Sequence, residues 1–225
     1  MKDWTHEAKL PAGDSNKAAQ GKTYRVRNLF GVLMSGFLFW CWDSINRKAS
    51  PGVDKLDAIA YEDNLIGNIQ QLAQQVKQGT YRAKLVLRKW IPKIGGKLRP
   101  LGIPAIADKL LQLAVAKVLE AIYEQDFLPC SYGYRPRTGA HKAIKDLTSE
   151  LNSKKYHVVV EADIKGFFNA INHDVLMDML VKRVDDKPFL KLIRKWLKAG
   201  ILETEGQVIH PLTGTPQGGT VFHQF

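Results

Sequence analysis

Residues 156–173, with the sequence YHVVVEADIKGFFNAINH, constrain the fold more than any other part of the chain. Within them, residues 157–162 hold three consecutive valines between polar neighbours, and such a short β-branched run predicts a buried strand. The strand would deliver the Asp163 carboxylate at its carboxyl end. An aspartate in that position more often turns the chain or caps a helix than performs chemistry. The rest of the sequence therefore has to decide its role.

The residues after Asp163 predict a turn and then a helix. Gly166 permits the turn ahead of two aromatic side chains, Phe167 and Phe168. The helix is expected to begin at residue 172 or 173, because apolar residues follow at helical spacing.

The chain carries a formal net charge of +11, and the excess of cations is unevenly placed. Residues 1–155 contain 25 lysines and arginines against 14 acidic residues, whereas residues 156–225 contain 8 of each. A basic N-terminal part followed by a neutral C-terminal part indicates that the N-terminal part binds a polyanion, such as a nucleic acid, and that a reaction centre follows it in the chain. The alternative is a merely basic soluble protein.

The cysteines and the apolar segments bear on the compartment. Cys41 and Cys130 lie far apart without metal-ligand spacing, which fits a reducing, cytoplasm-like compartment. Residues 1–28 are polar and rich in small and basic residues, which predicts a poorly ordered segment without a secretory signal. The apolar run at residues 29–42 is too short to span a bilayer, so no membrane partner is expected.

Several further elements follow from periodicity and turn residues. The expected helices span residues 29–45, 61–78, 108–123 with Asp108 as the cap, a stretch after Gly139, and 187–198. The helix at residues 108–123 is interpreted as part of the hydrophobic core, without a catalytic role. A small hairpin is expected over residues 202–209, with its turn at Glu205 and Gly206.

A second, basic hairpin is expected over residues 85–103. Its strands, residues 85–94 and 97–103, would be joined by a two-residue Gly95-Gly96 loop. No acidic residue occurs from residue 64 to residue 107. The cations in and before the hairpin are candidates for RNA phosphate binding: Arg82, Lys84, Arg88, Lys89 and Lys93, followed by Lys97 and Arg99. A solvated sheet edge kept basic against aggregation is the alternative.

The loop at residues 132–141, YGYRPRTGAH, combines two arginines with two aromatic residues. Arginine and aromatic side chains together can hold an RNA backbone and its bases, so Arg135 and Arg137 are further RNA-binding candidates. A packed loop with surface arginines fits the same composition.

Three motifs in order resemble those of group II intron-encoded reverse transcriptases, also called maturases. They are IPKIGGKLRPLGIP at residues 91–104, ADIKGFFNAINH at residues 162–173 and TPQGG at residues 215–219. The resemblance covers roughly residues 50–220. It implies an α+β, right-hand polymerase-type fold with an N-terminal extension at residues 1–49, fingers at residues 50–155 and a partial palm at residues 156–225.

The resemblance also assigns roles to single residues. Asp163 matches the first metal-binding, catalytic aspartate, and Mg²⁺ is the expected ion because hard cations prefer oxygen ligands. Phe168 matches the position whose ring excludes a 2′-hydroxyl, which leaves Phe167 for core packing. The incoming nucleotide would be bound by residues from two other motifs: Lys97 and Arg99 at the triphosphate, and Gln217 and Gly218 beside the nucleotide and template.

The implied reaction is RNA-templated addition of deoxynucleotides to a DNA primer, by two-metal nucleotidyl transfer. Its partners would be an RNA template, group II intron RNA, a DNA primer and deoxynucleoside triphosphates, in a bacterial cytoplasm or an organelle. The alternatives are an RNA-binding splicing module without polymerisation, and a degenerate remnant.

The chain departs from the family pattern in several places. Asn169 and Asn172 stand where relatives often carry aspartates, and Thr138 stands where an arginine is common. Relatives continue past TPQGG to a hairpin with an Asp-Asp pair, whereas no such pair follows Gly219 here. The expectation is a chain truncated before that hairpin, which binds nucleic acid and does not polymerise by itself.

Overall fold

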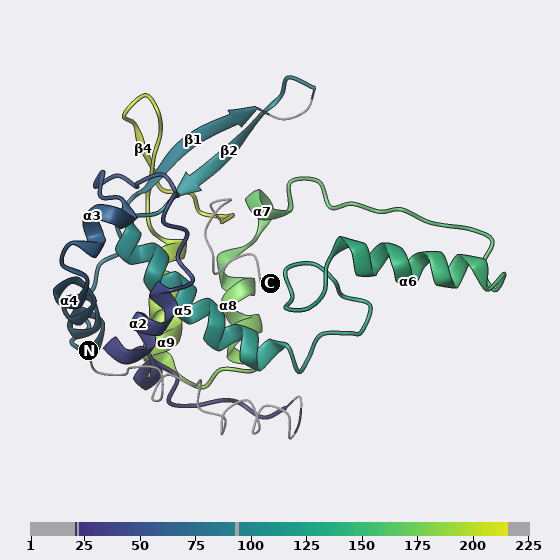
Figure 1. Ribbon diagram of the computed structural model, residues 1–225, viewed down its shortest axis with the longest axis horizontal. Helices are drawn as coiled ribbons and strands as arrows, with labels where there is room; N and C mark the ends of the chain where they lie inside the picture. The colour runs from purple at the N-terminus through teal and green to yellow at the C-terminus, as the bar shows by residue number, and fades with distance from the viewer. Residues whose placement is uncertain (1–20, 22, 93–94, 216–225) are drawn as a thin grey trace.

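The computed structural model describes residue 21, residues 23–92 and residues 95–215. They form an α+β fold in which helices surround one long helix, with a small sheet at one end and an extended arm at the side (Figure 1). The elements follow in the order η2 (Phe30–Val32), α2 (Ser35–Trp42), α3 (Ala58–Glu62), α4 (Leu65–Lys77), β1 (Val86–Pro92), β2 (Leu98–Ile103), α5 (Ile106–Tyr123), α6 (Ala140–Asn152), α7 (Phe167–Ala170), α8 (His173–Val181), α9 (Lys187–Leu197), β3 (Ile201–Leu202) and β4 (Val208–Ile209).

The helix α5 lies at the centre, because its apolar face is broad enough to be covered from several sides. Leu110, Leu111, Ala114 and Val115 have no exposed surface. The core around them contains buried side chains of α2, α4, α8 and α9. The predicted core helix is therefore confirmed.

The predicted cap of α5 is wrong. The helix begins at Ile106 with Ala105 as the N-cap, and Asp108 is buried at the third helical position. An acidic residue in the first turn suits the helix dipole as well as a cap, so the sequence alone did not separate the two. Instead, the Asp108 carboxylate accepts hydrogen bonds from the Tyr81 hydroxyl (2.5 Å) and the Lys84 amide (3.0 Å).

Residues 23–49 belong to the same core. Val26 is buried and forms an isolated parallel bridge with Val184, while Arg27 pairs with Asp185 at 2.8 Å. The prediction of a poorly ordered segment is therefore wrong for residues 23–28, because a single buried valine anchors an otherwise polar stretch. Residues 1–20 and 22 lie outside the described residues. The division into extension, fingers and partial palm stays a prediction, since described residues of all three parts share one core.

Two predicted helices are interrupted in the structure. The run at residues 29–45 forms η2 and α2, separated where Met34 is extended. The helix predicted over residues 61–78 is largely α4, but it begins only at Leu65, because residues 61 and 62 end α3; the Asn68 side-chain amide donates to the Tyr61 carbonyl across the break (2.8 Å). None of the helices among the described residues is long and apolar enough to cross a membrane.

The sheet has the strand order β2-β1-β3-β4. β1 and β2 pair in antiparallel register from Leu87 opposite Ile103 to Pro92 opposite Leu98, whereas β3 lies parallel to β1. The predicted two-residue loop is wrong, because β2 begins at Leu98 and leaves Lys97 in the loop beside Gly95 and Gly96. Gly95 and Gly96 do adopt positive φ angles, +90° and +77°, as the turn requires.

The β3–β4 hairpin and the start of α8 agree with the sequence predictions. The small hairpin β3–β4 turns at Glu205 and Gly206, and Gly206 has a φ of +86°. α8 begins where expected, because the Asn172 side chain accepts hydrogen bonds from the amides of Asp174 (2.9 Å) and Val175 (3.1 Å).

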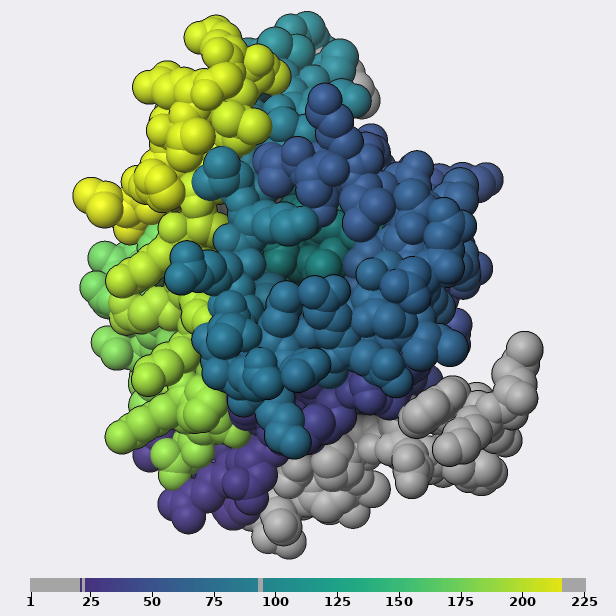
Figure 2. Space-filling model, turned by 90° about the vertical axis from the view of Figure 1, so that its left-hand side faces the viewer, coloured from purple at the N-terminus to yellow at the C-terminus, as the bar shows by residue number. Residues whose placement is uncertain are grey.

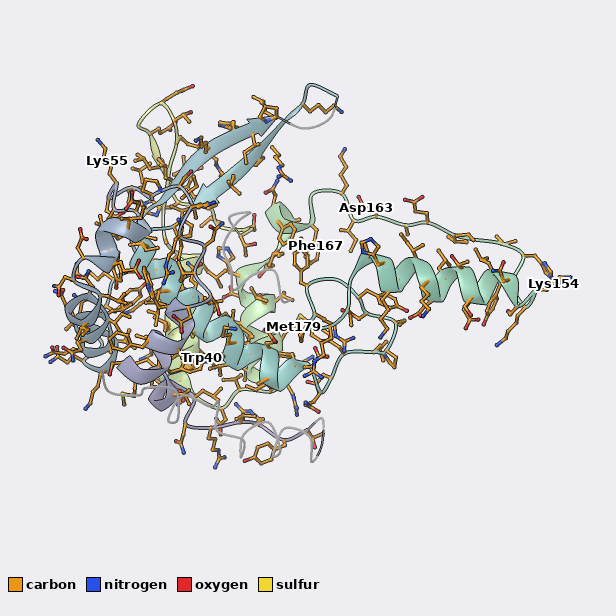
Figure 3. All side chains as sticks on the ribbon, in the orientation of Figure 1. Trp40, Lys55, Lys154, Asp163, Phe167 and Met179 are labelled. Atoms are coloured by element: carbon orange, nitrogen blue, oxygen red, sulfur yellow. The ribbon has the colours of Figure 1, made fainter. Side chains whose placement is uncertain are left out.

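The predicted strand at residues 157–162 is wrong in this structure. After α6 the chain returns as an extended segment without strand assignment, and α6 with this segment forms the arm in Figures 1 and 3. Val158 and Val160 are 78% and 87% exposed. A strand needs a neighbour to satisfy its backbone, and no described residue pairs with this segment.

Candidate nucleotide and RNA interface

On the hairpin β1–β2, the exposed cations Lys89 and Arg99 share one face, whereas Arg88 lies on the other. In an antiparallel pair, residues directly opposite one another lie on the same face and the face alternates along each strand. Lys89 faces Leu101 and Arg99 faces Ile91, whereas Trp90 faces Pro100. Lys89, Lys97 and Arg99 are exposed, and within the described residues none of them forms an ion pair. These cations are available to a phosphate-bearing ligand.

Two other cations from the basic stretch are held by acidic partners. Arg88 is largely buried and pairs with Glu203 of the β3–β4 hairpin at 3.2 Å. Lys84 pairs with Asp54 at 2.9 Å. The cations of the acid-free stretch are therefore not all unpaired in the fold, because the carboxylates of Asp54 and Glu203 form ion pairs with two of them. Lys93 lies outside the described residues.

Arg135 is engaged in holding its own loop. Its guanidinium forms two hydrogen bonds to Glu124 (2.6 and 3.1 Å) and donates to the carbonyls of Leu128 and Ser131. The hydrogen bond from Arg135 lowers the pKa of the Glu124 carboxyl below its usual range. RNA binding by Arg135 stays a prediction, whereas Arg137 beside it is exposed.

A buried polar cluster anchors the chain just before strand β1. The Tyr81 hydroxyl donates to Asp108 of α5 and accepts a hydrogen bond from the Trp196 indole of α9 (2.8 Å). Burial raises the pKa of Asp108 above its usual range, and burial also raises the pKa of Tyr81. Since a buried polar group without a partner is costly, this cluster ties the chain before β1 to both helices. The sequence showed only an apolar helix here, without a sign of the cluster.

Asp163 lies exposed on the extended segment that leads back from the arm, between the tip at Lys154 and Phe167 (Figure 3). Glu161, two residues before, is also exposed. Among the described residues, no three His, Cys, Asp or Glu side chains gather closely enough to hold a metal ion. A carboxylate suits Mg²⁺ in kind, but the described residues supply one such ligand rather than a complete site.

The Asp-Asp pair that does occur, Asp185 and Asp186, has structural partners. Asp185 forms ion pairs with Arg25 (3.3 Å) and Arg27 (2.8 Å). Asp186 caps α9 through the amide of Phe189 (3.0 Å). Neither carboxylate is therefore free to serve a metal site.

The two phenylalanines lie on the short helix α7, which begins after Gly166 with a φ of +67°. Their rings meet edge to face at a centroid distance of 5.4 Å. Phe168 is partly buried, whereas Phe167 is 39% exposed. The prediction that Phe167 packs in the core is wrong, because its side chain is exposed and takes no part in the core cluster.

The chain just before Gln217 and Gly218 packs directly on α7. The Thr215 amide donates to the Phe168 carbonyl (2.8 Å), and the Gly214 amide donates to the Ile171 carbonyl (2.7 Å). Gly214 has a φ of +83°, and a Cβ atom there would lie 2.8 Å from the Asn169 carbonyl oxygen. Two motif regions more than forty residues apart are thus joined. Gln217 and Gly218 themselves lie outside the described residues.

One further contact at this junction was missed by the sequence reasoning. The His173 ring nitrogen Nε2 lies 2.7 Å from the Gly214 carbonyl oxygen, and Asn172 bridges to Thr213. The sequence marks this histidine only as a helix start, and its partner is forty-one residues away.

The chain matches the family described as reverse transcriptase (RNA-dependent DNA polymerase) over residues 91–221. It is similar to protein YkfC of Escherichia coli, with 35% identity over 175 residues, 76% of this chain and 46% of that protein. It is also similar to the group II intron-encoded protein LtrA of Lactococcus lactis, with 42% identity over 152 residues, 67% of this chain and 25% of LtrA.

The fold has a counterpart among solved structures. A chain of a partial Cas6-RT-Cas1–Cas2 complex superposes with a TM-score of 0.51 and 23% identity, and the match covers 86% of this chain and 32% of that one. This chain spans less than half the length of either relative named above. The match over residues 91–221 includes all three motifs, and the chain therefore belongs to the reverse transcriptase family.

Proposed function

We propose that this chain forms the fingers and the beginning of the palm of a group II intron reverse transcriptase, which copies RNA into DNA. The observation that supports this most is the packing of residues 213–215 on α7. It brings the chain that leads to Gln217 and Gly218 against the turn that carries Phe168. The similarity to the group II intron-encoded protein LtrA supports the assignment to intron RNA.

The free cations of the hairpin suit an incoming nucleotide. The Arg99 guanidinium can form bidentate hydrogen bonds to phosphate oxygens, while the Lys97 ammonium adds a compact positive charge. Both side chains are exposed and unpaired within the described residues. In this proposal they hold the triphosphate, Phe168 lies against the deoxyribose, and the neighbouring Lys89 contacts the RNA strand.

Asp163 would supply one ligand to Mg²⁺, which when bound neutralises the charge that develops on the transferring phosphate. The arm presents this carboxylate to solvent, so the rest of the ligand set has to come from other residues and from the nucleotide. Two-metal transfer needs several carboxylates. Primer extension is therefore expected only from a polypeptide that supplies the others.

The test is RNA-templated primer extension with Mg²⁺ and deoxynucleotides, by the 225-residue chain and by a longer polypeptide that continues it. Asp163→Ala should abolish extension by the active form. Glu161→Ala is the matched control, because Glu161 is an equally exposed carboxylate two residues away. Equal loss in both variants, or no loss in Asp163→Ala, would contradict the role of Asp163.

A second candidate is an RNA-binding splicing module that does not polymerise. The free cations of the hairpin, together with a single candidate metal carboxylate among the described residues, favour it. Salt-sensitive RNA binding without extension, even in the longer polypeptide, would select this alternative.

A further inference from the structure

Two adjoining hollows run along α9. One has a volume of about 930 Å³ and lies between residues 79–85 and the carboxyl-terminal half of α9, with Gly200 and His210 at its end. The other, of about 420 Å³, continues toward Phe30 and Pro188. The hollows share Gly79, Tyr81, Lys191 and Lys195, so they form one depression, which we call the α9 groove.

The lining of the α9 groove is rich in cations. Its basic residues are Lys77, Arg82, Lys191, Arg194, Lys195 and Lys198, and no acidic residue is among the described residues that line it. Like charges gathered in one depression repel one another, and α9 itself contains no acidic residue to offset them.

Two of the six cations are already engaged. Arg194 pairs with Asp174 of α8 at 2.7 Å, and the Lys195 ammonium donates to the Tyr81 carbonyl at 2.6 Å. The other four make no ion pair within the described residues, and Lys77, Arg82, Lys191 and Lys198 are all exposed. The groove therefore has free positive charge on both walls, from residues 77–82 on one side and from α9 on the other.

The walls of the groove are held in place from beneath. Tyr81 is 3% exposed and is bonded through its hydroxyl to α5 and α9, and Lys195 bonds the Tyr81 carbonyl from the other wall. The spacing between the two walls is thus set by buried contacts. A ligand that fits gains its contacts without first ordering the walls.

The groove lies on the side of the molecule that faces the viewer in Figure 2, where the yellow-green atoms of α9 adjoin the blue atoms of residues 77–85. Asp163 is on the arm, which extends from the opposite side in Figures 1 and 3. A strand in the groove is therefore not the strand held beside Asp163.

We propose that the α9 groove binds the phosphodiester backbone of a single-stranded RNA segment, separate from the template at the candidate nucleotide site. Four free cations can neutralise about four phosphates, and α9 gives the groove a length of about 16 Å. The proposal rests on the proposed function in one respect, namely that the partner of this chain is RNA.

The test measures the salt dependence of RNA binding to the whole chain, with a single-stranded RNA oligomer. The groove variant combines Arg82→Gln, Lys191→Gln and Lys198→Gln, which remove charge and keep most of each side chain. Its slope of log affinity against log salt should be shallower by about two units, since each phosphate on a single strand contributes about 0.7. The matched control, Lys55→Gln with Lys182→Gln and Lys187→Gln, removes three exposed charges outside the groove and should leave the slope unchanged.

A second measurement uses the wild-type chain and so does not depend on how the variants fold. Bound RNA should protect Lys191 and Lys198 from acylation by an amine-reactive ester, whereas Lys187 on the same helix should react as before. Tripolyphosphate at equal phosphate concentration should not remove the protection of Lys191 and Lys198 by RNA, because a groove of this length gains its affinity from several phosphates on one strand. Loss of that protection would identify a site for small anions in the groove instead and would overturn the proposal.

The outcomes separate this proposal from the proposed function. An unchanged slope in the groove variant, with RNA still bound and Lys191 unprotected, would overturn the groove proposal alone. A wild-type chain that does not bind RNA at all would overturn the RNA partner on which both rest. Loss of primer extension in Asp163→Ala bears only on the proposed function.

Discussion

Phe167 and Phe168 are adjacent on α7 but differ in how far their side chains are exposed. Phe168 is partly buried and its carbonyl anchors Thr215, whereas Phe167 is 39% exposed. A ring can exclude a 2′-hydroxyl only where it is held against the sugar. The gate role of Phe168 stays a prediction, whereas the core packing expected for Phe167 is wrong, since that ring is 39% exposed.

Phe168→Ala is expected to admit ribonucleotides in the polypeptide that supplies the remaining carboxylates. Removal of the ring leaves room at the 2′ position of the sugar. The measurement is the ratio of kcat/KM for deoxynucleotide and ribonucleotide incorporation. Phe167→Ala is the control and should keep the wild-type ratio, and a larger shift in that variant would mean that the two rings have exchanged roles.

The contact between Glu124 and Arg135 predicts a pH-dependent loop. Because the pKa of Glu124 is lowered in the folded chain, its contribution is present at neutral pH and is lost as the pH falls through that lowered value. Residues 128–139 should therefore become more accessible to a protease at acidic pH. Glu124→Gln should show the acid-type cleavage already at pH 7, while Glu150→Gln, which changes an exposed carboxylate on α6, should not.

At the scale of elements, Tyr81 joins the chain before β1 to α5 and α9. Tyr81→Phe removes one hydroxyl and leaves both the Asp108 carboxylate and the Trp196 indole without that partner. We expect a loss of about 1–3 kcal/mol in the free energy of unfolding. Denaturant titration measures it.

Tyr132→Phe is the matched control for this loss. Its hydroxyl also bonds a carboxylate, that of Asp146 at 2.7 Å, but in a more exposed place. Water can replace that partner, so the expected loss is at most about 1 kcal/mol. Equal losses in both variants would mean that burial of the cluster around Tyr81 adds nothing.

Elements with local causes were predictable, and those that depend on distant partners were not. The cap at Asn172, the glycine turn at Gly206 and the apolar face of α5 are each visible within a few residues. The strand at residues 157–162 was predicted from its valines alone, yet strand formation depends on a neighbour that the pattern does not contain. The ion pair between Arg88 and Glu203 likewise joins residues too far apart for any local pattern.

Two substitutions test directly whether residues 157–162 are exposed or form the buried strand that the sequence predicts. Val160→Thr should change the free energy of unfolding by no more than about 0.5 kcal/mol, because Val160 is 87% exposed. Val184→Thr introduces the same hydroxyl at a site with no exposed surface and should cost about 1–3 kcal/mol. A large loss from Val160→Thr would show that the segment packs as the buried strand that the sequence predicts.

At the scale of the whole molecule, two surfaces that share no residue each gather exposed cations without an ion pair among the described residues. The hairpin carries Lys89, Lys97 and Arg99, and the α9 groove carries its own four free cations. The overall charge indicated a polyanionic partner from the sequence alone. The division into two surfaces was not predictable, because Arg82 adjoins the hairpin in sequence but lies in the groove in the fold.

The two faces predict additive salt dependence. Lys89→Gln, Lys97→Gln and Arg99→Gln together should make the slope of log affinity against log salt shallower by about two units for single-stranded RNA. Substitutions far apart without shared partners add, so combining this set with the groove set should make the slope shallower by about four units. With an RNA oligomer too short to reach both faces, each bound molecule contacts one face, so combining the two sets of substitutions should not add their effects on the slope. A combined variant no different from either triple variant, measured with a long RNA, would mean that the two faces bind the same phosphates, and the separation seen in the fold would not describe the complex.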